Sequence, residues 1–315
     1  MDGVLNVLKP PGMTSHDVVD VVRRAAGIRR VGHTGTLDPG AAGLLVCCVG
    51  RATRLSEFLM EADKEYRVEL RLGRRTSTGD VYGDVLPDPD SPVPRRPVTR
   101  ASLDAAIKRF SGEILQVPPM VSAIHHEGAR LYQLARRGEV VELQPRPVTI
   151  HRLQILRFDR EQGSVLLEVV CGKGTYIRKL CADMGDALGV GGYAQFMVRM
   201  RAGRFEIRDA MTLEELAAAA AEGRLRDAMI SMDGAVAHLP AVDLPERSVV
   251  EVMNGHPVPL WRFGGIRISE DVPVRLRSPR GSLVALARVD GGTLRPFKVL
   301  AGDGGGLVAH RPRPR

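Results

Sequence analysis

A single acidic side chain stands in a glycine-rich stretch near the N-terminus, where residues 31–54 read VGHTGTLDPGAAGLLVCCVGRATR. Asp38 opens an Asp-Pro-Gly sequence, and the apolar run after it predicts a buried strand. A carboxylate in such a loop can serve as a nucleophile or a base. It can equally be an ordinary turn residue that hydrogen-bonds its own backbone. His33 and Thr34 crowd the same loop and favour the chemical alternative.

The surrounding residues exclude several familiar chemistries. No lysine follows the glycines, as a phosphate-binding P-loop requires. Aspartyl-phosphate enzymes place their nucleophile two residues before "TGT", and that position is Gly32 here. Neither a cluster of metal ligands nor a glycosidase-like pair of carboxylates is evident. Asp38 is therefore expected to act without a metal ion.

Two other short segments place a tyrosine close to an arginine. They are KEYRVEL, with Tyr66, and GTYIRKL, with Tyr176 and Arg178. An aromatic ring beside a guanidinium suits a protein that stacks an unpaired base and binds its phosphate. The alternative for each segment is a core tyrosine next to a solvated arginine.

The charge balance favours an acidic partner. The chain of 315 residues has a formal net charge of +8, and residues 241–315 contribute +5 of it. Nucleic acid is the commonest such partner, although a basic soluble protein without one fits the composition too. The four cysteines include no CxxC motif and predict reduced thiols, and neither a secretory leader nor a membrane span is evident. We expect a cytoplasmic protein without a membrane association.

Helical and strand patterns alternate along the first 240 residues. Capping residues and apolar periodicity predict helices over 14–27, 99–110, 174–189 and 212–223. Strands are predicted over 3–10, 43–50, 148–156 and 164–172, and the segment 51–73 reads as a helix passing into a strand. Residues 32–40 are predicted to form a loop. Beyond residue 240, short strands between glycine and proline turns predict a small all-β unit.

Six segments in order resemble those of the TruB family of bacterial tRNA pseudouridine synthases. The most specific are RRVGHTGTLDPGAAGLLVCCVGRATR and CGKGTYIRKLCADMG. The resemblance covers nearly the whole chain and implies an α+β fold. Residues 1–240 would form a catalytic domain on a mixed, mostly antiparallel sheet flanked by helices. Residues 241–315 would form a PUA-like RNA-binding domain with a disordered basic tail.

The resemblance implies a reaction that needs no cofactor and no metal. Uridine 55 in the T loop of tRNA is flipped out, its glycosidic bond is cleaved, and the base is rejoined through C5. Asp38 matches the essential aspartate of the family, and Arg178 matches its arginine partner. A guanidinium suits this role because it holds a carboxylate bidentately and offsets the cost of burying that charge. Tyr66 matches the tyrosine that stacks on the base and is a candidate for moving the C5 proton.

The remaining matches concern substrate binding. Tyr176 matches a second aromatic of the pocket, and His33 a histidine that fills the space left by the flipped base. Met197 stands where the family has a leucine against the uracil, and methionine is similar in volume. Lys9 is expected to support the loop or a phosphate. Two further departures, at Met200 and His125, replace a threonine and a lysine.

Three functions stay open at this point. The first is a stand-alone RNA isomerase that acts on the T-arm stem-loop of tRNA as a monomer, without a protein partner. The second is an RNA chaperone that folds tRNA, and both can hold for one protein. The third is the guide-dependent archaeal or eukaryotic relative, against which the segment RLYQLARRG at 130–138 argues.

Overall fold

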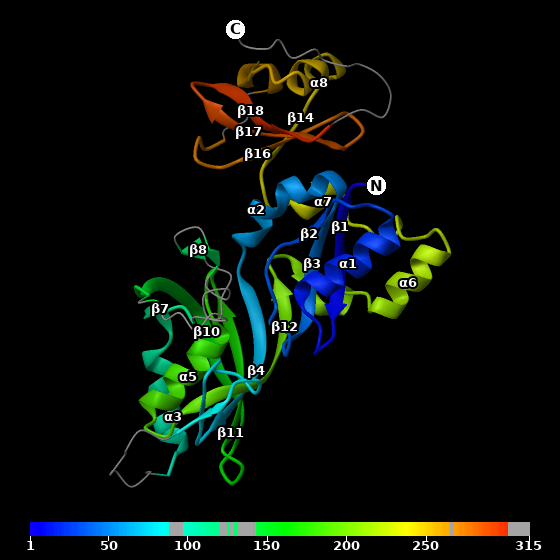
Figure 1. Cartoon of the computed structure of the whole chain (residues 1–315). Helices are drawn as coiled ribbons and strands as arrows, with labels where there is room; N and C mark the ends of the chain where they lie inside the picture. Colours follow the sequence, from blue (N-terminus) through cyan, green and yellow to red (C-terminus); the bar gives the residue numbers. More distant parts are fainter. Residues whose placement is uncertain are drawn as a thin grey trace.

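The computed structural model describes residues 1–87, 97–119, 125–126, 129–130, 141, 143–264 and 268–301. Within these ranges, none of the helices has the length and apolar character needed to cross a membrane. Most of RLYQLARRG, the side chain of His125 and the basic tail lie outside the described part. Most strands belong to one large sheet or to a separate smaller sheet nearer the C-terminus, as Figure 1 shows. Two short hairpins make up the rest of the described strands.

The large sheet has nine strands, and its central order interleaves distant parts of the sequence. β12 is parallel to β3, whereas its pairing with β4 and the other pairings of this sheet are antiparallel. The order is β1 (Gly3–Lys9), β3 (Ala42–Val49), β12 (Gly192–Ala202), β4 (Lys64–Leu72), β11 (Ser164–Cys171), β10 (Arg146–Asp159) and β7 (Gly112–Gln116). β2 (Val31–His33) pairs with β3 and β13 (Phe205–Glu206) with β12. The mixed, mostly antiparallel sheet is confirmed.

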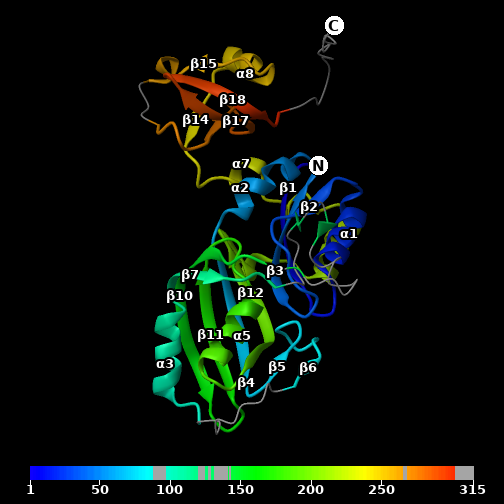
Figure 2. The same cartoon turned by 60° about the vertical axis from the view of Figure 1, so that its left-hand side comes forward.

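Helices cover the two ends of this sheet separately. α1 (Ser15–Ala26) and α6 (Leu213–Ala221) contact each other over β1 and β3. α3 (Arg100–Arg109) and α5 (Ile177–Ala187) lie against β10, β11 and β4 (Figure 2). Thr14 and Thr212, which precede α1 and α6, each form a capping box. The four predicted helices are thus confirmed.

β3 is buried along its whole length, which explains its uninterrupted apolar sequence. Cys47 faces the cluster beneath α1, and Cys48 faces a second cluster on the other side of the sheet. The short β2 pairs His33 with Cys47. The loop that the sequence predicts from Gly32 therefore begins only at Thr34.

The C-terminal unit contains a five-stranded sheet and an α-helix. The strand order is β14 (Ala241–Asp243), β16 (Val274–Arg277), β17 (Leu283–Asp290), β18 (Thr293–Val299) and β15 (Val258–Pro259). The β unit is confirmed, but α8 (Glu246–Met253) was not expected. Val252 of α8 is buried in the core of this unit, and Val249 packs against that core. The helix is only two turns long, which makes its periodicity hard to recognise in sequence.

This C-terminal unit packs tightly on the rest of the chain. Leu283, Leu286 and Leu300 belong to the same buried cluster as Val4 and Leu44 of the large sheet. The guanidinium of Arg51 in η1 (Gly50–Leu55) donates to the carbonyl of Leu300 at 3.1 Å. Arg275 forms an ion pair of 2.8 Å with Asp233 of α7 (Met232–Ala235). The unit completes the fold of the N-terminal part rather than hanging from a linker.

Candidate active site

The loop that carries Asp38 runs from Thr34 to Ala41, between β2 and β3. The amide of Ala41 donates to the carbonyl of Asp38 at 3.0 Å, so Asp-Pro-Gly does form a turn. The hydroxyl of Ser15, the first residue of α1, accepts from the amide of Leu37 and donates to its carbonyl, at 2.8 and 2.9 Å. The start of a capped helix therefore fixes the backbone next to Asp38.

Lys9 supports the same loop from β1. Its side chain is fully buried, and Nζ donates to the carbonyls of Ala41 at 2.7 Å, Pro39 at 3.2 Å and Pro10 at 2.9 Å. Burial lowers the pKa of Lys9 to about 8, although the nearby Asp38 acts in the opposite direction. Of its two expected roles, these contacts fit support of the loop.

Arg199 of β12 holds the loop from the other side and was not predicted from the sequence. Its guanidinium donates to the carbonyl of Gly35 at 2.9 Å, of Thr36 at 3.4 Å and of Leu44 at 2.8 Å. The residue is 2% exposed. A basic residue inside a buried, alternating strand was the available signal, because such a cation needs partners.

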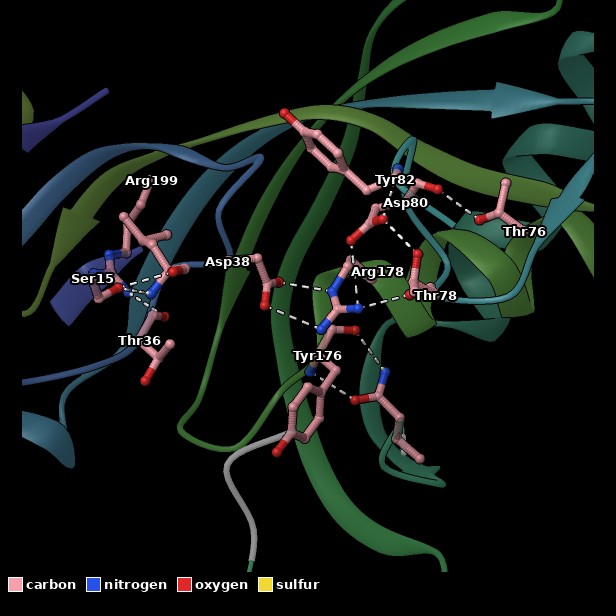
Figure 3. Close-up of polar contacts among 12 residues, drawn as sticks. Ser15, Thr36, Asp38, Thr76, Thr78, Asp80, Tyr82, Tyr176, Arg178 and Arg199 are labelled. Carbon is pink, nitrogen blue, oxygen red and sulfur yellow. Dashed lines mark hydrogen bonds and ion pairs between the residues drawn. The ribbon is translucent and has the colours of Figure 1, made fainter. Parts of the chain in front are cut away.

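The carboxylate of Asp38 meets the guanidinium of Arg178 in two parallel contacts (Figure 3). The Nε–Oδ2 distance is 2.7 Å and the Nη2–Oδ1 distance is 3.1 Å. The Arg178 side chain is 5% exposed, whereas that of Asp38 is 36% exposed. The predicted bidentate pair thus joins the loop to the first turn of α5 and leaves the carboxylate accessible.

A second carboxylate, Asp80, lies on the other side of Arg178 and was missed. Its Oδ2 is 3.5 Å from Nη1 of Arg178, and the same nitrogen donates to the carbonyl of Thr78 at 2.7 Å. Asp80 is itself held, because Oδ1 accepts from the Thr78 hydroxyl at 2.6 Å and from the Tyr82 amide at 3.0 Å. The acidic, glycine-rich STGDVYGD at 77–84 was its signal. Arg178 is therefore fixed between two carboxylates.

The pair faces a pocket with a cavity volume of about 530 Å³. Its lining includes the predicted Tyr66, Tyr176 and Met197 together with Asp38 and Arg178. Tyr66, Met197 and Arg178 lie on β4, β12 and α5, whereas Tyr176 immediately precedes α5 and Asp38 lies on the loop. The five side chains, separated by up to about 160 positions in sequence, surround one cavity.

Tyr66 and Tyr176 are positioned differently. Burial raises the pKa of Tyr66, with the nearby Arg199 opposing the shift, so Tyr66 is a neutral phenol at pH 7. Tyr176 is the residue before α5, where the buried side chain of Gln116 accepts from its amide at 2.8 Å and donates to its carbonyl at 3.1 Å. Gln116 was not singled out in the sequence, and it fixes the entry into the helix that carries Arg178.

His33 lies at the base of the loop. Its neighbour Thr34 lines this pocket, whereas His33 itself does not. The amide of Gly35 donates to its Nδ1 at 3.3 Å. Burial, together with the charges of Arg199 and His16, lowers the pKa of His33 to about 4, so the ring is neutral at pH 7. Its expected role at the vacated stacking position stays a prediction.

The arrangement suits chemistry on a planar base. An accessible carboxylate with a fixed orientation can attack or deprotonate one centre, and the buried Arg178 holds it in that orientation through two contacts. Two tyrosines and a methionine supply an apolar surface for a ring. Over the described ranges, the structure gathers no three His, Cys, Asp or Glu side chains that could hold a metal ion.

Comparison with known proteins agrees with this reading. Residues 23–177 match the model of the TruB family pseudouridylate synthase N-terminal domain, and residues 178–237 that of the tRNA pseudouridylate synthase B C-terminal domain. The boundary between the two models falls at Arg178, yet β12, within the second, lies between β3 and β4 of the first. Both matches therefore describe one folded unit.

Curated relatives match over most of the chain. A protein from Pelotomaculum thermopropionicum, named tRNA pseudouridine synthase B, is 48% identical, with 91% of each chain covered. One of the same name from Moorella thermoacetica is 46% identical, covering 95% of this chain and 99% of that one. The chain belongs to the TruB family of pseudouridylate synthases, and it is accordingly an isomerase.

Solved structures extend the likeness to a more distant group. The chain superimposes on a crystal structure of a Cbf5–Nop10–Gar1 complex with a TM-score of 0.72 and 29% identity, covering 95% of this chain and 85% of that one. A structure of an H/ACA RNP bound to a substrate RNA containing 2′-deoxyuridine gives the same TM-score at 26% identity. The α+β fold with a C-terminal β unit is thus that of pseudouridine synthases.

Proposed function

We propose that this chain converts the T-loop uridine of tRNA, position 55, into pseudouridine. The observation that carries the proposal is the bidentate pair of Asp38 and Arg178 at the mouth of an aromatic-lined pocket. The curated relatives that match over nine tenths of the chain carry the name tRNA pseudouridine synthase B. This similarity, well above that to the Cbf5 structures, favours a stand-alone enzyme over a guide-dependent one.

In the proposed reaction the base stays in the pocket throughout. The C1′–N1 bond breaks, the uracil turns, and C1′ bonds to C5. A proton leaves C5 and another is taken up at N1, so the product is an isomer of the substrate. Asp38 acts on the centre that reacts, and Arg178 holds its carboxylate in a fixed orientation.

The neighbouring side chains are assigned to binding the base. Tyr66 stacks on the uracil, and because it is a neutral phenol it must give up its own proton in order to take up the one that leaves C5. Tyr176 and Met197 close the pocket, and His33 occupies the place of the flipped base. Lys9 fixes the loop of Asp38. The energetic cost of flipping, a few kcal/mol, is offset by these contacts.

The C-terminal unit is assigned to tRNA binding at a distance from the chemistry. Its net positive charge and its five-stranded sheet support a PUA-like domain that begins at residue 241. We further propose that the protein works as a monomer in the cytoplasm, with tRNA as its partner. A contribution to tRNA folding follows from the same binding and base flipping.

The test is to incubate the purified protein with an unmodified tRNA transcript and with its T-arm hairpin. Pseudouridine is mapped with a chemical adduct that stops reverse transcription. We expect a single stop at position 55 with both RNAs. Absence of the stop with the folded wild-type protein would refute the proposal.

A further inference from the structure

A second, smaller pocket lies next to Asp38 and is not used in the reaction described above. It shares Asp38 and Met197 with the catalytic pocket, and its other lining includes Gly40, Tyr82 and Phe196. The shared residues make it a direct continuation of the catalytic site. A ligand that fills the first pocket therefore has its neighbouring groups close to the second.

The aromatic side chains of this second pocket are exposed. Tyr82 is 64% exposed and Phe196 is 42% exposed, and Val81, which also lines this pocket, is 45% exposed. Figure 3 shows the Tyr82 ring pointing away from the ion pair of Asp38 and Arg178. Exposed apolar groups at the edge of a catalytic pocket indicate a binding surface rather than core packing.

Tyr82 is nevertheless held in place. Its amide donates to Oδ1 of Asp80, which in turn contacts Arg178. Its ring lies against the Asp-Pro-Gly turn, where a Cβ on Gly40 would come within 2.2 Å of Cε2 of Tyr82. Only glycine permits this approach. The Tyr82 backbone is thus fixed beside the catalytic pair, and its exposed ring lies against the catalytic loop.

We infer that Tyr82 and Phe196 stack on an unpaired base of the RNA, that of a nucleotide adjacent to the target uridine. The inference rests on the proposed function. Two exposed aromatic side chains that line one pocket suit a nucleobase, because unpaired bases of RNA loops bind by stacking on aromatic side chains. The continuity of the two pockets through Asp38 and Met197 selects the adjacent nucleotide.

The inference is tested by binding in the Asp38→Asn background, where turnover does not obscure the equilibrium. Adding Tyr82→Leu should weaken binding of the T-arm hairpin about tenfold, because an aliphatic side chain keeps the contact with Gly40 but loses stacking. Adding Tyr82→Phe instead should restore binding to within about twofold, since the ring is retained. Leu156→Ala, at an exposed apolar residue of β10, serves as the control.

The location of the base is tested with two hairpins, each abasic at one nucleotide next to the target. On one of them Tyr82→Leu should cause no further loss, while on the other the tenfold loss should persist. An equal loss on all three hairpins, or a Tyr82→Phe variant as weak as Tyr82→Leu, would overturn the inference. So would unchanged binding by Tyr82→Leu, the outcome expected if this patch instead receives a protein. Pseudouridine formation by the wild type is scored separately and tests only the proposed function.

Discussion

The buried cations around Asp38 and the exposed arginines of the C-terminal unit serve opposite purposes. Lys9, Arg178 and Arg199 are all buried and are hydrogen-bonded to carbonyls or carboxylates of the catalytic region. Arg247 and Arg280 of the C-terminal unit are exposed to solvent. Buried charges with several partners fix geometry to a fraction of an ångström, whereas exposed ones act through long-range attraction that salt screens. Substitution of one side chain in the first region should therefore change catalysis or stability, whereas substitution of the exposed arginines should change how tRNA binding depends on ionic strength.

The largest expected effect is at the acidic centre of the buried region. Asp38→Asn preserves the shape of the side chain but removes its ability to act as a nucleophile or base. We expect kcat to fall by on the order of 10³-fold or more, with tRNA affinity nearly unchanged. Single-turnover formation of pseudouridine and filter binding measure the two quantities. Turnover close to that of the wild type would show that Asp38 is not the reacting group.

Arg178→Lys should be the next most harmful substitution. The charge is kept, but the two contacts with Asp38 and the contact with the carbonyl of Thr78 cannot be made together. Misplacement of the carboxylate should lower kcat by about 10²-fold, with a smaller change in KM. Arg75→Lys, at an exposed ion pair with Asp186, is the matched control. Equal kinetics of the two variants would remove Arg178 from the site.

Arg199→Met should show that the buried region is held by cations as well as by apolar contacts. The substitution keeps much of the volume but leaves the carbonyls of Gly35, Thr36 and Leu44 without their donor. We expect the free energy of unfolding to fall by about 2–5 kcal/mol. Urea denaturation measures it, with Arg100→Met on the exposed face of α3 as the control. A loss below about 0.5 kcal/mol would mean that the loop is fixed without Arg199.

The sequence predicted the pair of Asp38 and Arg178 but not the side chains that hold it. Asp38, Tyr66 and Arg178 lie in distinctive motifs, and the structure brings them around one pocket. Asp80, Gln116 and Arg199 act through contacts with backbone or charged groups that lie 60 or more positions away in the sequence. Such contacts depend on the pairing of β12 with β3 and β4, which local patterns do not specify. The α8 helix was missed because two turns give too little periodicity.

The exposed region should respond to salt instead. Arg247→Gln and Arg280→Gln combined remove two charges that lie on the surface of the C-terminal unit. If both contact phosphates, the slope of log K against log salt should become shallower by about 0.7–0.9 for each. Arg100→Gln on α3 should leave the slope unchanged. Deletion of residues 241–315 is a poor substitute, because it would expose the cluster that Leu283, Leu286 and Leu300 complete.

The smallest effect expected is on the pH dependence of stability. The pKa of His33 is lowered to about 4 in the folded protein from an ordinary value near 6.5. Between these values the unfolded chain binds more protons, so stability is lost as pH falls from 7 towards 4. His33→Asn should reduce the difference in urea midpoint between pH 7.5 and pH 5. A difference equal to that of the wild type would show that His33 is not protected from protonation.

The position of β12 between β3 and β4 also affects how the chain can fold as it leaves the ribosome. β1 and β3 can pair early, but the gap between β3 and β4 stays open until residue 202 has been synthesised. The buried cluster that includes Val4 and Leu44 is complete only once Leu300 has been synthesised. The hydrogen bond from Arg51 to Leu300 spans 249 positions. Pairing over such separations is slow and leaves apolar edges uncovered meanwhile. Nascent chains of this protein should therefore depend on chaperones until synthesis is almost complete.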